Sequence, residues 1–402
     1  MFTRLDDYQE VAPRGSLELL RRLADQLAGR RFLHVNASRF GGGSPELLGR
    51  LVPLLAELGI DVGWEVVVGD PEFYATVTAL EQCLQGQPTD MRDPMLRAYA
   101  EAAAGNAGTL DLDADLVLVH DVAPLPLVRN RPGRGAWAWA GHLDLSRASR
   151  RVWNVLRQDV GRYDAAIYAL PKFAQRLRIP MLIMYPAIDP LSEKNRDLSR
   201  AEVQQVLQGL GVPTDKPLLI QIAPYARQND LPGVIRAYRL AKQYVACRLV
   251  LAGGGVGDNP EGAALLAAVR EMGAGDPDLH ALVLPPDAAH EINALQHAAT
   301  VVIHTPLRAG FELGVAEAMW KGKPVIGSMA GGIPVQVLFE VTGYTVTSVE
   351  GTAFRVRQLL QNPDLRARLG GAAREYVRRN FLITRQVGDY LTLLARMTHA
   401  RS

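Results

Sequence analysis

The sequence predicts an α/β protein made of two doubly wound, Rossmann-like domains that face each other across an interdomain cleft. Three observations predict this fold. Short apolar segments of strand length alternate with amphipathic segments of helix length along the chain. Glycine-rich loops follow several of the strand segments. The chain also has 402 residues, which is more than one ordinary hydrophobic core accommodates.

The first half of the chain carries the first alternation. A helix is expected over residues 16–29, where Ser16 is a suitable N-cap and Gly29 a suitable C-cap. Further helices are expected at 45–58, 72–84 and 91–105, and strands at 32–36, 62–69, 116–120, 136–141, 165–169 and 181–185.

The second half begins after residues 185–191, which contain two prolines and no periodicity and so indicate a linker. Strands are expected at 218–222, 248–252, 281–284, 300–304, 324–327 and 344–347. Helices are expected at 199–210, 231–243, 260–273, 290–298, 313–321, 351–361, 363–379 and 383–397. We expect the last helix to pack back on the first domain. The first domain would then comprise residues 1–195 with 382–402, and the second residues 196–381.

Composition excludes several classes of function. A formal net charge of +2 provides no basic surface for nucleic acid or an anionic membrane. Cys83 and Cys247 are the only cysteines, which excludes a disulfide framework and favours a reducing, cytoplasmic location. The first residues have no apolar stretch of a secretory signal, and no apolar run reaches the roughly 20 residues of a membrane span. No spacing of ligand residues indicates a metal site, and no cofactor is expected.

The segment 304–336 has the clearest functional pattern. A loop at 305–310 precedes the helix 313–321, which carries Glu317, and a short strand leads to the glycine-rich loop 330–334. A helix that begins beside a glycine-bearing loop at the end of a parallel strand is a usual binding place for an anionic ligand. Backbone N–H groups of Gly331, Gly332 and Ile333 are therefore candidate ligand contacts.

Three motifs of the first half are candidate site residues. Gly41, Gly42 and Gly43 lie between a strand and a helix, and three successive glycines exceed what a tight turn alone requires. His120 and Asp121 end a strand on its carboxyl side, where catalytic groups collect, although a buried histidine that only satisfies a loop carbonyl is an equal alternative. A third motif, His142-Leu-Asp144-Leu-Ser, follows the next strand, which carries Trp137 and Trp139, and at least one of these tryptophans can simply be core.

Together these motifs resemble the trehalose glycosyltransferring synthases of family 4 of the retaining glycosyltransferases. Similar to that family are residues 34–36 followed by 41–46, the motif 142–146 and the segment 188–195. The stretches 253–262 and 291–296 are further matches. The resemblance implies a GT-B type fold, transfer of glucose from a nucleoside diphosphate donor to free glucose, and a homodimer.

The resemblance also implies roles for single residues. His142 would lie against the anomeric centre, with His120 and Asp121 beside it as further catalytic candidates. Glu317 would hydrogen-bond the ribose hydroxyls. The remaining implied ligand contacts are the backbone of Gly42 and Gly43 at the donor, Asp144 at the sugar, and residues 330–333 at the acceptor or phosphate side.

Four departures from the family pattern fall at the donor site. The family's Arg and Lys, which hold the diphosphate, become Pro224 and Asn229, and Arg227 supplies a charge only from a shifted position. The first Glu of the pair separated by seven residues becomes Ala309. Glu312 stands where the family has Gly and adds a negative charge. Cations that stabilise an expelled diphosphate are worth roughly 2–4 kcal/mol each.

These observations leave three functions open. One is an active retaining transferase, which the overall resemblance favours. Another is a pseudo-enzyme that works as a ligand sensor or scaffold subunit, and the last is a transferase with an altered donor. Because of the departures, the interpretation that we rank highest is a synthase-like protein with impaired or absent glucosyl transfer. Such a protein would bind a sugar or sugar nucleotide weakly or in an altered way.

Overall fold

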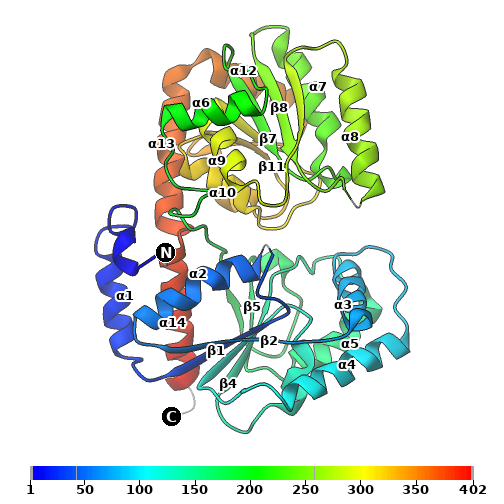
Figure 1. Cartoon of the computed structure of the whole chain (residues 1–402), viewed down its shortest axis with the longest axis vertical. Coiled ribbons are helices and arrows are strands. Elements are labelled where there is room, and N and C mark those ends of the chain that lie inside the picture. The colour runs from blue at the N-terminus through cyan, green and yellow to red at the C-terminus, as the bar shows by residue number, and fades with distance from the viewer. Residues whose placement is uncertain (1–2, 42, 258, 400–402) are drawn as a thin grey trace. The chain divides into compact units, whose positions relative to one another are not determined.

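The computed structural model describes residues 3–41, 43–257 and 259–399, and these form two compact units (Figure 1). Unit 1 comprises residues 3–186 with 383–399, and unit 2 comprises residues 187–382. Each unit contains one six-stranded sheet, in which all the registered neighbours are parallel. The predicted α/β, doubly wound fold class is therefore confirmed.

Unit 1 has the strand order β2-β1-β3-β4-β5-β6. Successive strands are added on one side of β1 up to β2 and on its other side from β3 onward, so the topological switch point lies between β1 and β3. Its strands are β1 (Arg31–Asn36), β2 (Asp61–Val66), β3 (Leu116–His120), β4 (Ala136–Gly141), β5 (Ala165–Tyr168) and β6 (Met181–Ile183). Its helices are α1 (Ser16–Asp25), α2 (Ser44–Glu57), α3 (Pro71–Leu84), α4 (Asp93–Ala107), α5 (Arg150–Val160) and α14 (Ile383–His399), with 3-10 turns at η1 (Leu5–Tyr8), η2 (Leu125–Asn130) and η3 (Pro171–Phe173).

Unit 2 is built on the strand order β12-β11-β10-β7-β8-β9, which reverses between β7 and β10. Its strands are β7 (Leu218–Ile222), β8 (Arg248–Gly253), β9 (Leu279–Val283), β10 (Val301–His304), β11 (Val325–Ser328) and β12 (Gly343–Val346). Its helices are α6 (Arg200–Gly209), α7 (Leu231–Lys242), α8 (Pro260–Gly273), α9 (Ala289–Ala298), α10 (Leu313–Trp320), α11 (Ile333–Gln336), α12 (Val349–Gln361) and α13 (Pro363–Asn380), with a 3-10 turn at η4 (Arg227–Asn229).

The sequence analysis missed α5, whose residues are strongly amphipathic and bury Val152, Trp153, Leu156 and Val160. It also took residues 333–334 as loop, whereas a single turn, α11, begins there behind two glycines. The predicted helix 16–29 ends earlier, at Asp25, and its N-cap is Gly15 rather than Ser16. Ser16 instead donates its hydroxyl hydrogen to the carbonyl of Pro13 (2.6 Å).

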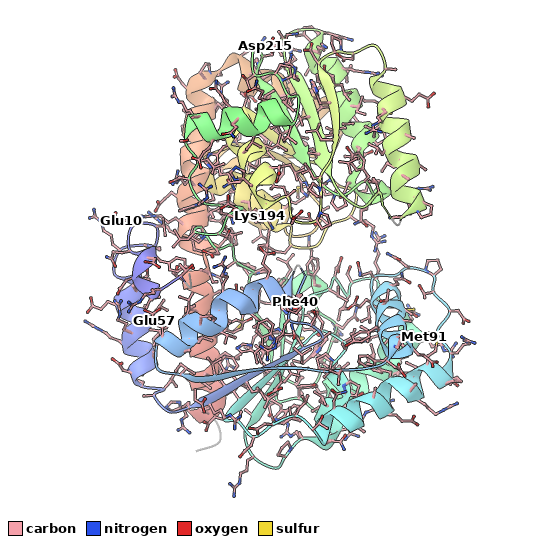
Figure 2. The ribbon with its side chains drawn as sticks, in the orientation of Figure 1. Glu10, Phe40, Glu57, Met91, Lys194 and Asp215 are labelled. Carbon is pink, nitrogen blue, oxygen red and sulfur yellow. The ribbon has the colours of Figure 1, made fainter. Side chains whose placement is uncertain are left out.

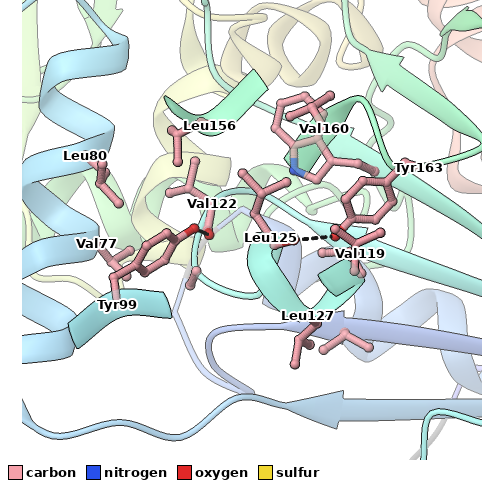
Figure 3. Close-up of a cluster of buried hydrophobic side chains, with 14 of the residues drawn as sticks. Val77, Leu80, Tyr99, Val119, Val122, Leu125, Leu127, Leu156, Val160 and Tyr163 are labelled. Atoms are coloured by element: carbon pink, nitrogen blue, oxygen red, sulfur yellow. Dashed lines mark hydrogen bonds between the residues drawn. The ribbon is translucent and has the colours of Figure 1, made fainter. Parts of the chain in front are cut away.

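The core of unit 1 lies between its sheet and the helices α3, α4 and α5 (Figure 3). β3, β4 and β5 are buried along their whole length, as expected of central parallel strands covered on both faces. Two buried tyrosines satisfy their hydroxyls within this core. Tyr163 donates to the carbonyl of Leu125 (2.7 Å), and Tyr99 donates to the carbonyl of Val122.

The chain returns to unit 1 at its end, where α14 packs against α1, α2 and β3. Gly388 permits the close approach of α14 to α1, because a Cβ atom there would lie 3.2 Å from the Leu20 side chain. None of the helices in the described part of the chain is long and apolar enough to cross a membrane.

The linker segment 187–195 packs with unit 2 and not, as the predicted boundary at 195 had it, with the first domain. Ile188 pairs with Leu382, and Asn293 of α9 donates from its amide to the carbonyls of Glu193 (2.8 Å) and Arg196 (2.9 Å). Contacts with α9 therefore fix the segment, and these contacts are invisible in the local sequence.

A buried lysine completes this anchor. Lys321 Nζ donates to Asn195 Oδ1 (3.0 Å), to Gln296 Oε1 (2.8 Å) and to the carbonyl of Glu317 (3.3 Å). Lys321 as a whole is 7% exposed to solvent. Burial lowers the pKa of Lys321 to about 7, against a partly compensating attraction from Glu317.

This lysine gives the fold a pH dependence of known sign. Between pH about 7 and 10.5 the unfolded chain holds a proton on Lys321 that the folded chain releases, so the free energy of unfolding rises with pH. In Lys321→Met that contribution should vanish, which flattens the rise by roughly 2–4 kcal/mol. Urea unfolding at pH 7 and pH 10 measures the difference, with Lys172→Met at an exposed position as the matched control. Equal pH slopes in wild type and variant would contradict the assignment.

Candidate functional site

Three histidines from neighbouring strands of unit 1 form a hydrogen-bonded row at the point where the strand order reverses. His34 Nδ1 lies 3.1 Å from His120 Nε2, and His120 Nδ1 lies 3.0 Å from His142 Nε2. The ring planes of His120 and His142 differ by 6° and their centroids are 5.4 Å apart, which fits rings that lie edge to edge. The structure thus brings His120 and His142 together and adds His34 behind them.

The row is buried at its inner end. His34 is 0% exposed and His120 is 1% exposed, while His142 is half-buried. Burial lowers the pKa of His34 to about 3. Burial lowers the pKa of His120 well below its usual value, and the neighbouring charges that His34 and His142 would carry lower it further. The inner histidines are therefore neutral at physiological pH.

Asp121 fixes the geometry around the outer histidine. It adopts the left-handed conformation, with φ +59°, which costs a non-glycine residue roughly 1 kcal/mol or more. In this conformation its Oδ1 accepts from the backbone N–H of His142 (2.9 Å). Its carbonyl accepts from Trp139 Nε1 (2.7 Å), and its own N–H donates to Ala140 O (2.8 Å). Asp121 therefore ties the end of β3 to the end of β4.

Glu81 on α3 is a candidate site residue that the sequence analysis missed. Burial, and to a smaller extent the negative charge of Asp121, raise the pKa of its carboxyl to about 7. A perturbed carboxyl beside a second carboxylate is a usual feature of functional sites. No motif signals Glu81, because its environment is created by burial in the fold and by the charge of Asp121.

The other predicted contacts of unit 1 lie in loops at the same edge. Gly43, with φ +74°, is the N-cap of α2, and a Cβ there would meet nothing within 4 Å, so its backbone faces open space. Gly42 lies outside the described residues. Asp144 Oδ1 accepts from the N–H of Ser146 (2.9 Å), which orders the loop after β4. Phe40 in the loop after β1 is 86% exposed (Figure 2).

Both tryptophans of β4 belong to the core. Trp137 is 0% exposed and Trp139 is 1% exposed, and both lie on the same face of β4, in the core cluster of unit 1. Neither is available to a ligand, so the alternative of a core role holds for both.

In unit 2 the strand order reverses between β7 and β10, and two loops meet there. The N–H of Leu307 in the loop after β10 donates to the carbonyl of Gln228 in the loop after β7 (2.7 Å). Asn229 is only 5% exposed, and its amide donates to the carbonyl of Pro224 (2.8 Å). Asn229 therefore closes its own loop, and Pro224 beside it is exposed and carries no charge.

Arg227 does not point its charge into this junction. Its side chain is 85% exposed, and its Nε lies 3.0 Å from Glu261 Oε1 at the first turn of α8. An exposed ion pair of this kind contributes little energy and leaves the guanidinium in solvent.

Glu312 is the N-cap residue of α10, and its carboxylate is hydrogen-bonded within the protein. Its φ is +66°, and its Oε1 accepts from the N–H of Gly310 (3.0 Å) while its Oε2 accepts from His304 Nε2 (2.9 Å). Burial raises the pKa of this carboxyl, but the hydrogen bond and charge of His304 and the bond from Gly310 outweigh it, so the net pKa is lowered. A negative charge is therefore fixed where a helix start otherwise receives an anion.

The glycine pair of the next loop serves close packing of the chain on itself. A Cβ on Gly331 would lie 2.1 Å from the carbonyl of Gly310, and the N–H of Gly332 already donates to that carbonyl (2.8 Å). Ile333 is 0% exposed and lies in the core. The structure thus places Gly331 and Gly332 against the loop 309–311 and Ile333 in the core.

Glu317 lies on α10 with its side chain 11% exposed, and its Oε1 is 3.9 Å from Lys194 Nζ (Figure 2 labels Lys194). Two polar residues of the matched stretch 291–296, which lies in α9, have structural bonds. Asn293 holds the linker, and Gln296 holds Lys321 and donates to the carbonyl of Gly314 (3.2 Å).

A cavity of about 460 Å³ opens in unit 2 at the carboxyl ends of β10, β11 and β12. Its polar lining includes Thr305, Ser328 and Ser348 together with the Asp230 carboxylate, and no lysine or arginine lines it among the described residues. No group of three or more His, Cys, Asp or Glu side chains in the described ranges is arranged to hold a metal ion.

Comparison with known proteins places the chain in a family. Residues 34–175 match the trehalose synthase N-terminal domain, and residues 203–376 match glycosyl transferases group 1. The chain is 36% identical over 398 residues to the trehalose synthase of Pyrococcus horikoshii, covering 97% of this chain and 96% of that protein. The chain belongs to the trehalose synthase family.

Another member of the trehalose synthase family, from Rubrobacter xylanophilus, is 34% identical over 403 residues, covering 98% of this chain and 97% of that protein. A solved structure described as trehalose-6-phosphate from E. coli bound with UDP-2-fluoro glucose superposes with a TM-score of 0.70. At 14% identity, over 90% of this chain and 98% of that chain, this likeness shows the GT-B fold that the trehalose synthase family shares.

The Glu81 carboxyl predicts a second pH effect of opposite sign. Between pH about 4.5 and 7 the fold holds a proton that the unfolded chain has lost, so stability decreases as pH rises through this window. Glu81→Gln should remove that decrease, a change of about 1–2 kcal/mol after allowance for solvent screening. Thermal unfolding at pH 5 and pH 8 measures it, and Glu72→Gln on the exposed face of α3 is the control. Parallel curves for wild type and Glu81→Gln would show that the carboxyl is not perturbed.

Proposed function

We propose that this member of the trehalose synthase family binds a sugar at the histidine row of unit 1 but is impaired in glucosyl transfer from a nucleoside diphosphate donor. The observation that carries the proposal is the way polar and charged side chains are already paired at the β7–β10 junction, where the loops that follow β7 and β10 meet. There Asn229 bonds to the loop of Pro224, Arg227 pairs with Glu261, and Glu312 contributes a carboxylate.

A leaving diphosphate develops negative charge that fixed donors and cations must stabilise. At this junction the Gly310 N–H is already engaged by Glu312, and the Gly332 N–H by the carbonyl of Gly310. A diphosphate that entered would have to displace one carboxylate and would meet its repulsion. The junction is therefore suited to a neutral ligand better than to an anionic one.

The bond between Glu312 and His304 strengthens this argument. The carboxylate is held from two sides, so it does not simply swing into solvent when an anion arrives. Since its pKa is lowered, it does not become neutral at physiological pH either.

Unit 1 supports the sugar half of the proposal. His142 and Asp144 follow β4 at the carboxyl edge, where His120 and Asp121 are hydrogen-bonded to His142 and Glu81 interacts electrostatically with Asp121. Carboxyl and imidazole groups at one sheet edge suit hydrogen bonding to hydroxyls.

A second candidate is a transferase that uses a donor without a diphosphate. The complete histidine row and the well-held Asp121 favour it, because a protein that had lost all chemistry would need neither. A role as a ligand sensor or scaffold subunit is distinguished by a stoichiometric partner in a pull-down. We also propose a homodimer, in line with the family resemblance, to be measured by light scattering.

Ligand binding tests the proposal directly. Calorimetric titration of metal-free protein with UDP, ADP and UDP-glucose should give only weak binding, roughly 100-fold or more weaker than a site with two cations, because each lost charged donor costs roughly 1.5–3 kcal/mol. Tight binding of any of these nucleotides would refute the proposed impairment. Glucose and trehalose, titrated in parallel, report on unit 1 separately.

Restoring the charges should restore the donor site. The combination Pro224→Arg, Asn229→Lys, Ala309→Glu and Glu312→Gly should strengthen UDP-glucose binding by at least about tenfold and bring measurable transfer to glucose. Glycine is well suited to position 312, where φ is +66°. Gln228→Arg, which adds a charge at an exposed position of the same loop, is the matched control. An equal gain from the control would mean that net charge, and not the site, is responsible.

A further inference from the structure

The histidine row of unit 1 constrains where its hydrogens lie. A neutral imidazole carries one hydrogen on one of its two nitrogens. Both nitrogens of His120 face another histidine, at 3.1 Å and 3.0 Å. Its hydrogen must therefore point to one neighbour, and the other neighbour must donate to it. The three rings have only two arrangements that satisfy both bonds.

In the first arrangement His34 donates from Nδ1 to His120 Nε2, and His120 donates from Nδ1 to His142 Nε2. The remaining hydrogen of His142 is then on Nδ1. In the second arrangement every bond is reversed. His142 donates from Nε2, and the hydrogen of His34 moves to its Nε2.

The inner end of the row discriminates between the two. His34 Nε2 is buried and has no hydrogen-bond partner among the described residues. The aromatic rings around it belong to Phe32, with centroids 4.3 Å apart, and Tyr390, with centroids 5.6 Å apart. The second arrangement places an N–H donor in this apolar surrounding, and buried N–H groups without an acceptor are the rarer kind of unsatisfied group.

The outer end favours the same arrangement. Asp121 Oδ1 accepts from the backbone N–H of His142 (2.9 Å), so a carboxylate lies beside the backbone of this residue. Nδ1 is the ring nitrogen nearer to that backbone, and a hydrogen on it is the arrangement that the negative charge favours. The Glu81 carboxyl also interacts electrostatically with Asp121.

We propose that His34 and His120 are positioning residues that lock His142 in the tautomer with its hydrogen on Nδ1, so that His142 presents a hydrogen-bond donor to its ligand. Nε2 of His142 is occupied by His120. None of the described residues takes the His142 Nδ1–H, which is left for the ligand. His142 consequently acts as a donor to an oxygen atom and not as a general base.

This inference rests on the proposed function only for the identity of the ligand. A donor N–H at this place suits a hydroxyl or ring oxygen of a neutral sugar. The lock itself is a property of the free protein, and it stands or fails whether or not a sugar binds.

The test is the tautomer of His142 in the ligand-free protein. Long-range proton–nitrogen correlation spectra of protein with ¹⁵N-labelled histidine, at pH 7.5, distinguish the two neutral tautomers and the charged ring. His142→Gln identifies the His142 signals by their loss. We expect the Nδ1–H form to exceed the other by roughly tenfold. A dominant Nε2–H form, similar amounts of both, or a charged ring would each overturn the proposal.

Two variants of His34 separate a lock from ordinary packing. His34→Asp places only an acceptor beside His120 Nε2, which should reverse the row and move the His142 hydrogen to Nε2. His34→Phe leaves His120 Nε2 facing an apolar wall, where an N–H without an acceptor is disfavoured. His142 should therefore retain Nδ1–H, and a dominant Nε2–H form in this variant would contradict the proposal. A folded His34→Asp protein without reversal would contradict the coupling, and if that variant does not fold, the wild-type and His34→Phe spectra still decide.

Discussion

The parallel pairing of strands within each unit is the constraint on which the rest of this structure depends. Every strand of a parallel sheet ends at the same edge, so residues far apart in the chain become neighbours when they follow their strands. In unit 1 His120 ends β3 and His142 follows β4 at this edge, and His34 from within β1 is hydrogen-bonded to His120. In unit 2 it brings together the loops that follow β7 and β10.

The two edges have different electrostatic character. At the edge of unit 1 the histidines of the row are bonded to each other, and two carboxyl groups lie beside them. At the edge of unit 2 the groups that would meet an anion are already satisfied within the protein. A carboxylate takes one N–H, a carbonyl takes another, and an asparagine closes the loop. When the N–H groups of a site are already hydrogen-bonded within the protein, a charged ligand gains less binding free energy there, because each new hydrogen bond must replace an existing one.

The linker segment 187–195 is held against unit 2 by polar side chains. Its backbone carbonyls are bonded by Asn293, and its Asn195 side chain by the buried Lys321. Residues that resemble ligand contacts in the sequence thus have structural bonds in unit 2. Glu317 remains on the helix α10, mostly buried and close to Lys194.

The sequence by itself determined the alternation of strands and helices, and the strand bounds 116–120, 136–141 and 218–222 agree with the structure. It also placed His120, Asp121 and His142 at strand ends, because apolar runs and the residues that end them are local features. The sequence analysis missed α5, although its amphipathic pattern is a local feature. It could not show that α11 begins behind Gly332, since a single turn depends on the surface it packs against.

Only the tertiary structure decided which polar residues serve the fold and which face a ligand. Asn229, Gly332 and Asn293 are indistinguishable from binding residues in the sequence, and their partners lie in other parts of the chain or across a loop. The role of His34 and the shifted pKa of Glu81 likewise arise from neighbours supplied by other elements. Hydrogen bonding and burial depend on distances in space, and sequence order specifies those distances only through the complete fold.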